Sequence, residues 1–146
     1  MGKKRQLSTS RIISAPRQRI FDVIADPTMH PMIDGSGTVR EAQEGGPERL
    51  EAGASFGMQM KMGAAYRIAN TVVEFDEGER LAWRHFHGHR WRYELEDAEG
   101  GTRVTETFDW STAKTKWTLE LAGIPQKNLA AMEKTLERLE DVVVNG

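Results

Sequence analysis

Alternation of apolar and polar residues dominates the first four fifths of the chain. Residues 6–14 (QLSTSRIIS) alternate and predict a first strand. From about residue 38 to residue 112, further alternating runs are separated by short turns rich in Gly and acidic residues. The strands expected there cover residues 38–45, 54–63, 64–76, 80–87, 90–97 and 102–111. Because short connections join antiparallel neighbours, the pattern predicts an antiparallel meander.

Helical spacing is found on both sides of this strand-rich region. After the first strand, APRQRIFDVIADP places Ile20, Phe21, Ile24 and Ala25 on one face, and Asp26-Pro27 ends the helix. A short second helical turn is expected in TMHPMID. The end of the chain predicts a short helix over residues 116–121 and a long amphipathic helix from about residue 124. The apolar positions of this long helix recur every three or four residues, at Leu129, Met132, Leu136, Leu139 and Val143.

The order of these elements predicts an α+β fold. It contains a curved antiparallel sheet of about seven strands, one or two short helices after the first strand, and a long C-terminal helix on the sheet. A strongly curved sheet does not close flush on a single helix. The space between its concave face and the helix is therefore either filled by side chains or left as a pocket.

Composition narrows the class of protein. The chain has 146 residues, of which 38% are hydrophobic and 29% charged, so we expect a single globular domain over residues 1–146. No apolar run approaches the ~18 residues of a spanning helix, and the basic start MGKKRQLSTS is not followed by an apolar segment. We therefore expect a cytoplasmic protein without a signal peptide or stable membrane insertion.

Charge and cysteine content exclude further classes. The net charge is −2 with Lys and Arg interspersed among Asp and Glu, which is not typical of a nucleic-acid-binding protein. The chain has no cysteine, so disulfides, thiol nucleophiles and cysteine-ligated zinc are impossible. The sequence also lacks a nucleophile elbow, a phosphate-binding glycine loop and an HExxH helix.

Four segments resemble one superfamily. ISAPRQRIFDVIADP, TVVEFDEGERLAWRH, GGTRVTETFDWS and NLAAMEKTLERLED are similar to the START-like helix-grip proteins, which include the polyketide cyclase/dehydrase and lipid-transport group and the birch-pollen-allergen proteins. The resemblance covers nearly the whole chain. It implies a curved sheet wrapped around the C-terminal helix and a cavity for an apolar ligand. It implies no fixed chemistry, since members bind lipids, sterols, polyketides or hormones and some act as cyclases or dehydratases. We expect no cofactor.

Alternation also predicts which side chains face a pocket. In SFGMQMKM the apolar set is Phe56, Met58, Met60 and Met62, and methionine adapts to varied apolar shapes. The alternative for this stripe is ordinary core packing against the helix. Together with the other inward positions and the helix, the predicted ligand-binding residues are Phe56, Met58, Met60, Met62, Trp83, His85, Tyr93, Phe108, Trp110, Met132 and Leu136.

The stretch RHFHGHR places His85, His87 and His89 at alternate positions. If Gly88 makes a turn, only His85 and His87 share a face, and two histidines are too few for a closed zinc site, so no metal is expected. His85 follows Trp83 on the apolar face. It is interpreted either as a group that hydrogen-bonds a ligand or acts as a general base, or as a core histidine bonded to a neighbour.

Glu106 falls on the apolar face of its predicted strand. An inward carboxyl needs a partner, unless a β-bulge shifts the register and turns it outward. His85, Glu106 and Tyr93 are therefore the candidates for proton transfer. The sequence favours a monomeric or weakly dimeric module that binds a hydrophobic small molecule, such as a lipid, polyketide or aromatic compound. The alternatives are a polyketide cyclase/dehydratase-type enzyme and a domain whose cavity is filled.

Overall fold

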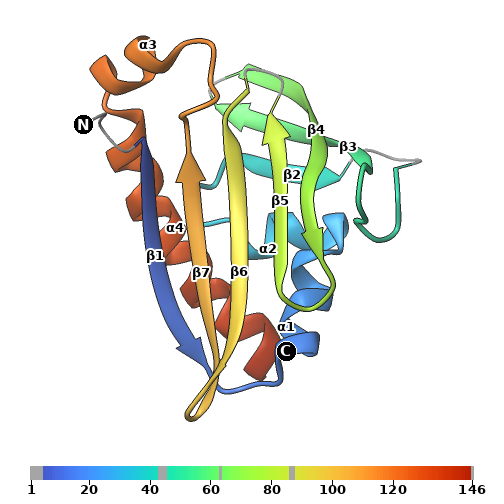
Figure 1. The fold of residues 1–146 in the computed structure, drawn as a ribbon. Helices are drawn as coiled ribbons and strands as arrows, with labels where there is room; N and C mark the ends of the chain where they lie inside the picture. Colours follow the sequence, from blue (N-terminus) through green and yellow to red (C-terminus); the bar gives the residue numbers. More distant parts are fainter. Residues whose placement is uncertain (1–4, 43–45, 63, 86–87, 146) are drawn as a thin grey trace.

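One curved antiparallel sheet forms the frame of the protein (Figure 1). The computed structural model describes residues 5–42, 46–62, 64–85 and 88–145. Its strands lie in the order β1-β7-β6-β5-β4-β3-β2, so the first and last strands of the chain are neighbours. Their bounds are β1 (Gln6–Ile13), β2 (Val39–Ala42), β3 (Ser55–Met62), β4 (Ala64–Asp76), β5 (Arg80–His85), β6 (Arg90–Ala98) and β7 (Gly101–Asp109). The predicted meander of about seven strands is confirmed.

The register around β7 decides the direction of Glu106. β7 pairs with β6 from Arg90↔Asp109 to Ala98↔Gly101, and with β1 over the whole length of β1, without interruption. Glu106 therefore faces the same side as Val104 and Phe108. The sheet does contain irregular positions, but they lie between β2 and β3 and between β4 and β5. The alternative in which a bulge turns Glu106 outward is wrong.

Short helices after β1 close one end of the sheet. α1 (Arg17–Ile24) buries Ile20, Phe21 and Ile24 completely. A 3-10 turn over Pro27–Met29 follows, capped by the Asp26 carboxylate, which accepts a hydrogen bond from the Thr28 N–H. α2 (His30–Ile33) continues from this turn and buries His30 and Ile33. These elements confirm the prediction of one or two short helices after the first strand.

The C-terminal helix α4 (Ile124–Glu140) packs against β1, β7 and α2 and continues as a π-helical turn over Asp141–Asn145 (Figure 1). It begins after Gly123, whose φ of 70° is left-handed and separates it from α3 (Lys116–Leu121). Its inward face is Met132, Thr135, Leu136 and Leu139. No helix in the described ranges is long and apolar enough to cross a membrane. A curved sheet gripping one long helix confirms the α+β helix-grip prediction.

The loop after α2 lies directly on α4. The Gly35 N–H donates to Thr135 Oγ1 (2.8 Å), which itself donates to the Ala131 carbonyl (2.9 Å). A Cβ atom on Gly35 would collide with the backbone of Ala131 and Thr135. The absence of a side chain at Gly35 therefore allows the loop to approach the helix. The loop forms one wall of a cavity between the sheet and α4.

Candidate functional site

A cavity of about 200 Å³ lies between the sheet and α4. Strands β2 to β7, α2 with the loop after it, and α4 all contribute side chains. Its apolar wall includes several of the residues predicted from alternation, namely Phe56, Met58, Met60, Trp83, Tyr93 and Met132. Phe56, Met58, Tyr93 and Met132 are each at most 5% exposed, so this wall is the inner surface of the protein.

Aromatic rings form the part of the wall nearest α2. The His30 and Trp83 rings stack at 5.0 Å with an interplanar angle of 21°. Phe56 meets both rings edge-on, at 5.7 Å from His30 and 5.6 Å from Trp83. Tyr93 lies 5.7 Å from Trp83 on the next strand. Each ring is held by its neighbours, which makes this wall rigid compared with the methionine wall.

His30 is the histidine that the cavity contains. Its Nε2 lies 2.8 Å from the Ile24 carbonyl, and because a carbonyl only accepts, Nε2 carries the proton. Burial lowers the pKa of His30 from its ordinary value, so the ring is neutral near pH ~7. His30 is not among the ligand-binding residues predicted from the sequence. It lies in a short helical turn between prolines, where no periodicity indicates a face.

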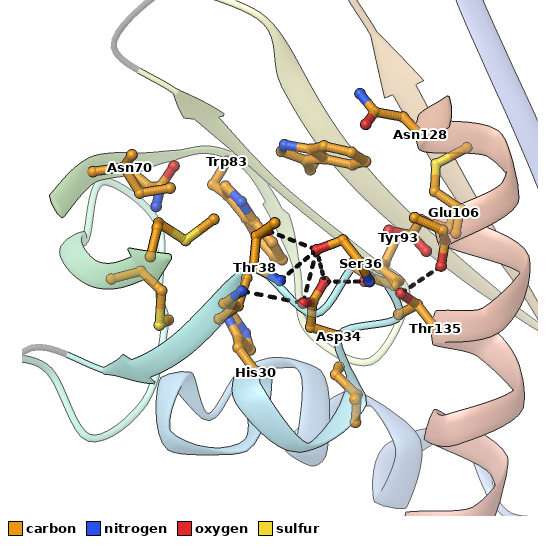
Figure 2. Close-up of a pocket in the computed structure, with 18 of the residues that line it drawn as sticks. His30, Asp34, Ser36, Thr38, Asn70, Trp83, Tyr93, Glu106, Asn128 and Thr135 are labelled. Carbon is orange, nitrogen blue, oxygen red and sulfur yellow. Dashed lines mark hydrogen bonds between the residues drawn. The ribbon is translucent and has the colours of Figure 1, made fainter. Parts of the chain in front are cut away.

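Glu106 and Tyr93 are paired residues on β7 and β6 and both line the cavity (Figure 2). Glu106 is 4% exposed, and its Oε1 atom has no hydrogen-bond partner among the described residues. Burial raises the pKa of Glu106 to about 8, the negative charge of Asp34 adds to this, and the Tyr93 hydroxyl opposes it. The carboxyl is therefore largely protonated near pH ~7 and can donate a hydrogen bond.

Other polar groups lie at separate points of the cavity. Asn70, on β4, is 3% exposed and its Oδ1 atom lacks a hydrogen-bond partner in the described part of the chain. Figure 2 shows Asn70 on one side, and Glu106 with Tyr93 on the other side near α4. The Asp34 carboxylate already has partners within the protein, because it accepts hydrogen bonds from the Ser36 hydroxyl (2.8 Å) and the Val39 N–H (3.2 Å). Asn70 and Glu106 thus remain to orient a ligand.

His85 and His89 lie opposite each other at a hairpin and are not among the cavity-lining residues. The His85 N–H donates to the His89 carbonyl (2.9 Å), and their rings stack at 4.6 Å. Gly88 has a φ of 99°, as expected for the turn residue. His85 is not among the cavity-lining residues, and its predicted role in ligand binding or proton transfer stays a prediction. Phe86 and His87 lie outside the described residues, within which no three His, Asp or Glu side chains gather as a metal site.

Three other predicted ligand residues are buried in apolar clusters and are not among the cavity-lining residues. Phe108 and Trp110 stack at 5.5 Å and belong to a cluster with Ala113 and Met132. The Trp110 indole N–H donates to Glu120 Oε1 (2.9 Å), which ties β7 to α3. Leu136 belongs to the main core. Their ligand-binding role also stays a prediction, as does that of Met62, whose side chain is outside the described part.

Comparison with known proteins identifies the family. Residues 4–144 match the family model described as polyketide cyclase/dehydrase and lipid transport. The uncharacterized protein Rv0088 of Mycobacterium tuberculosis H37Rv is 38% identical over 148 residues, covering 97% of this chain; the chain spans only 65% of that protein's length. The same figures hold for protein MT0096 of M. tuberculosis CDC 1551.

Two experimental structures share the fold at low identity. The crystal structure of protein NE0264 from Nitrosomonas europaea has a TM-score of 0.75 and 14% identity, covering 99% of this chain and 97% of that one. The NMR structure of an AHSA1-like protein from Aeromonas hydrophila has a TM-score of 0.69 and 18% identity, covering 92% and 89%. By its sequence match, and with a fold that agrees, the chain belongs to the polyketide cyclase/dehydrase and lipid transport family of START-like helix-grip proteins.

Proposed function

We propose that the protein binds a small hydrophobic molecule in the cavity between the sheet and α4. The observation that carries this proposal is an apolar space of about 200 Å³ with a rigid aromatic wall and an adaptable methionine wall. Burial of ligand surface there contributes about 25 cal/mol per Å² of apolar area. Membership of a family described by polyketide and lipid chemistry supports the same class of ligand.

A charge placed in the apolar wall tests the proposal. Met60 lines the cavity, so Met60→Glu introduces a carboxylate that a bound apolar molecule would have to desolvate. Met32→Glu is the matched control, because Met32 is 53% exposed on α2 and does not line the cavity. Binding of naphthalene, measured by equilibrium dialysis, should fall at least about tenfold in Met60→Glu and stay unchanged in Met32→Glu.

Equal binding by both variants would contradict the location of the site. Unfolding curves of the two variants are compared first, so that loss of the fold is not mistaken for loss of the site. Absence of naphthalene binding to the unmodified protein would contradict the proposed function itself.

One observation favours a second candidate function, a cyclase- or dehydratase-type activity. Glu106 combines a pKa of about 8 with a place on the cavity wall beside the Tyr93 hydroxyl. A carboxyl protonated near pH ~7 can give its proton to the carbonyl oxygen of a bound poly-β-ketone while an enol carbon of the same molecule attacks that carbonyl carbon. The enol O–H proton then returns to the Glu106 carboxylate, which restores the acid. Glu106→Gln should then abolish formation of the cyclised product and keep ligand binding. Equal product yields from both proteins would contradict this activity.

A further inference from the structure

Asp34 gives the cavity a negative charge that no cation among the described lining residues balances. Two carboxyl groups, those of Asp34 and Glu106, are among its lining residues, and no Lys or Arg is among the lining residues that the structure describes. The histidine His30 does not supply a positive charge, because its Nε2–H is used by the Ile24 carbonyl and burial disfavours its charged form. A ligand with an ionised acid group would therefore lose its hydration without gaining an ion pair.

Asp34 adds a fixed negative field at one wall. Its carboxylate accepts hydrogen bonds from the Ser36 hydroxyl and from the Val39 N–H. Burial is the main cause of the raised pKa values of Glu106 and Tyr93, and the negative charge of Asp34 adds to both. An anionic ligand would meet the same repulsion.

Two buried polar groups need partners that the described residues do not supply. Glu106 Oε1 and Asn70 Oδ1 are both buried and lack hydrogen bonds, and their side chains lie on different sides of the cavity in Figure 2. A buried polar atom left without a partner costs free energy, so a ligand that satisfies it gains affinity. A neutral carboxyl both donates and accepts, and it therefore matches a hydroxyl or a carbonyl group. The Asn70 Oδ1 atom only accepts, and it therefore matches a hydroxyl group.

The size of the cavity limits the ligand. A cavity of roughly 150 Å³ lined by apolar side chains accommodates benzene. The space of about 200 Å³ found here therefore suits one or two rings, or an aliphatic molecule of similar size. The ring systems of Trp83, Trp91 and Tyr93 line it and offer flat surfaces for such a ligand.

Resting on the proposed function, we infer that the cavity selects an uncharged molecule of one or two rings, with a hydroxyl group at the Asn70 end and a hydroxyl or carbonyl group at the Glu106 end, and that it rejects carboxylates of the same shape. One polar end meets Glu106 beside Tyr93 and the other meets Asn70. The apolar body lies between the aromatic and methionine walls.

Four probes of one ring system test this selectivity: naphthalene, 2-naphthol, 2,6-dihydroxynaphthalene and 2-naphthoate. Affinities are measured by equilibrium dialysis on the full chain near pH ~7, where 2-naphthoate is ionised and the naphthols are neutral. We expect affinity to rise from naphthalene to 2-naphthol to the diol, by about fivefold to tenfold per hydroxyl, and 2-naphthoate to bind at least about tenfold more weakly than 2-naphthol.

Two variants assign the polar ends. Asn70→Leu and Glu106→Leu should each lower the diol affinity by the contribution of one hydroxyl group, to about the affinity that the unmodified protein has for 2-naphthol. Glu106→Gln keeps a donor and an acceptor and should retain the diol affinity within about threefold. Unfolding curves show whether each variant is folded. If a variant is unfolded, the four-probe series on the unmodified protein still tests the charge selectivity.

The outcomes separate the two proposals. If 2-naphthoate binds as tightly as 2-naphthol, or the diol no better than naphthalene, the selectivity inferred here is overturned while the hydrophobic site stands. If none of the four probes binds, the proposed function itself fails.

Discussion

The Glu106 carboxyl lies directly opposite Tyr93 in the register of β6 and β7, buried on the concave face of the sheet. A carboxyl group buried at this position destabilises the fold little while it is protonated and strongly when it is ionised, because no water hydrates the charge. This relationship links the stability of the fold to the polar chemistry of the cavity.

The first prediction concerns stability against pH. The folded-state pKa of Glu106 is about 8 and its ordinary value is 4.5, so the folded protein holds a proton that the unfolded chain has released between these limits. The stability that this proton provides is complete below about pH 4.5 and is lost as pH rises toward about 8, at up to about 1.4 kcal/mol per pH unit. Glu106→Gln lacks this loss.

Urea unfolding from about pH 5 to about pH 9 measures the effect. The free energy of unfolding of the unmodified protein should fall relative to that of Glu106→Gln over this range. If the free energy of unfolding changes with pH in the same way in both proteins, Glu106 is not a buried carboxyl that is protonated in the folded state.

A second prediction concerns His30. His30→Phe keeps an aromatic ring against Trp83 and Phe56 and removes the hydrogen bond to the Ile24 carbonyl, at a cost of about 1–3 kcal/mol. Because the folded pKa of His30 is lowered, its contribution is complete above the ordinary value of 6.5 and is lost as pH falls toward the folded pKa. The gap in stability between the two proteins should therefore narrow from about pH 7.5 to about pH 5. A gap that stays constant or widens would contradict the lowered pKa of His30 in the folded protein.

A third prediction concerns the contact between the α2–β2 loop and α4. In Gly35→Ala the new methyl group collides with the backbone of Ala131 and Thr135, so we expect a loss of about 2–3 kcal/mol. Gly37→Ala is the control in the same loop. Its Cβ meets open space, and only its φ of 76° is unfavourable, so about 1 kcal/mol is expected. Thermal unfolding that ranks Gly37→Ala as the more harmful change would contradict the close approach.

Periodicity made most of the fold predictable. Alternation revealed the strands, and spacing of three and four revealed α4, because each pattern follows from which face is buried. The same rule identified Phe56, Met58, Met60 and Glu106 as inward-facing. Such local patterns need no knowledge of the tertiary structure.

Alternation shows which face of a strand a side chain lies on, but it does not show whether that part of the strand borders the cavity. His85 and Phe108 share their strand faces with Trp83 and Glu106, yet they lie beyond the cavity, in the hairpin and in the second apolar cluster. The reason is that lining depends on where α2 and α4 cross the sheet, which is a tertiary property. His30 was missed for the converse reason, since its short helical turn carries no periodic signal.

The most direct test of the central claim uses the tryptophans as four reporters in one spectrum. Trp83 and Trp91 line the cavity, Trp110 is buried in the neighbouring cluster, and Trp117 is 71% exposed on α3. In a ¹⁵N-labelled protein titrated with 2-naphthol, the account predicts that ring currents of the bound probe shift the indole N–H signals of Trp83 and Trp91 and leave that of Trp117 in place. Shifts confined to Trp117, or no shifts at all, would contradict a hydrophobic site between the sheet and α4.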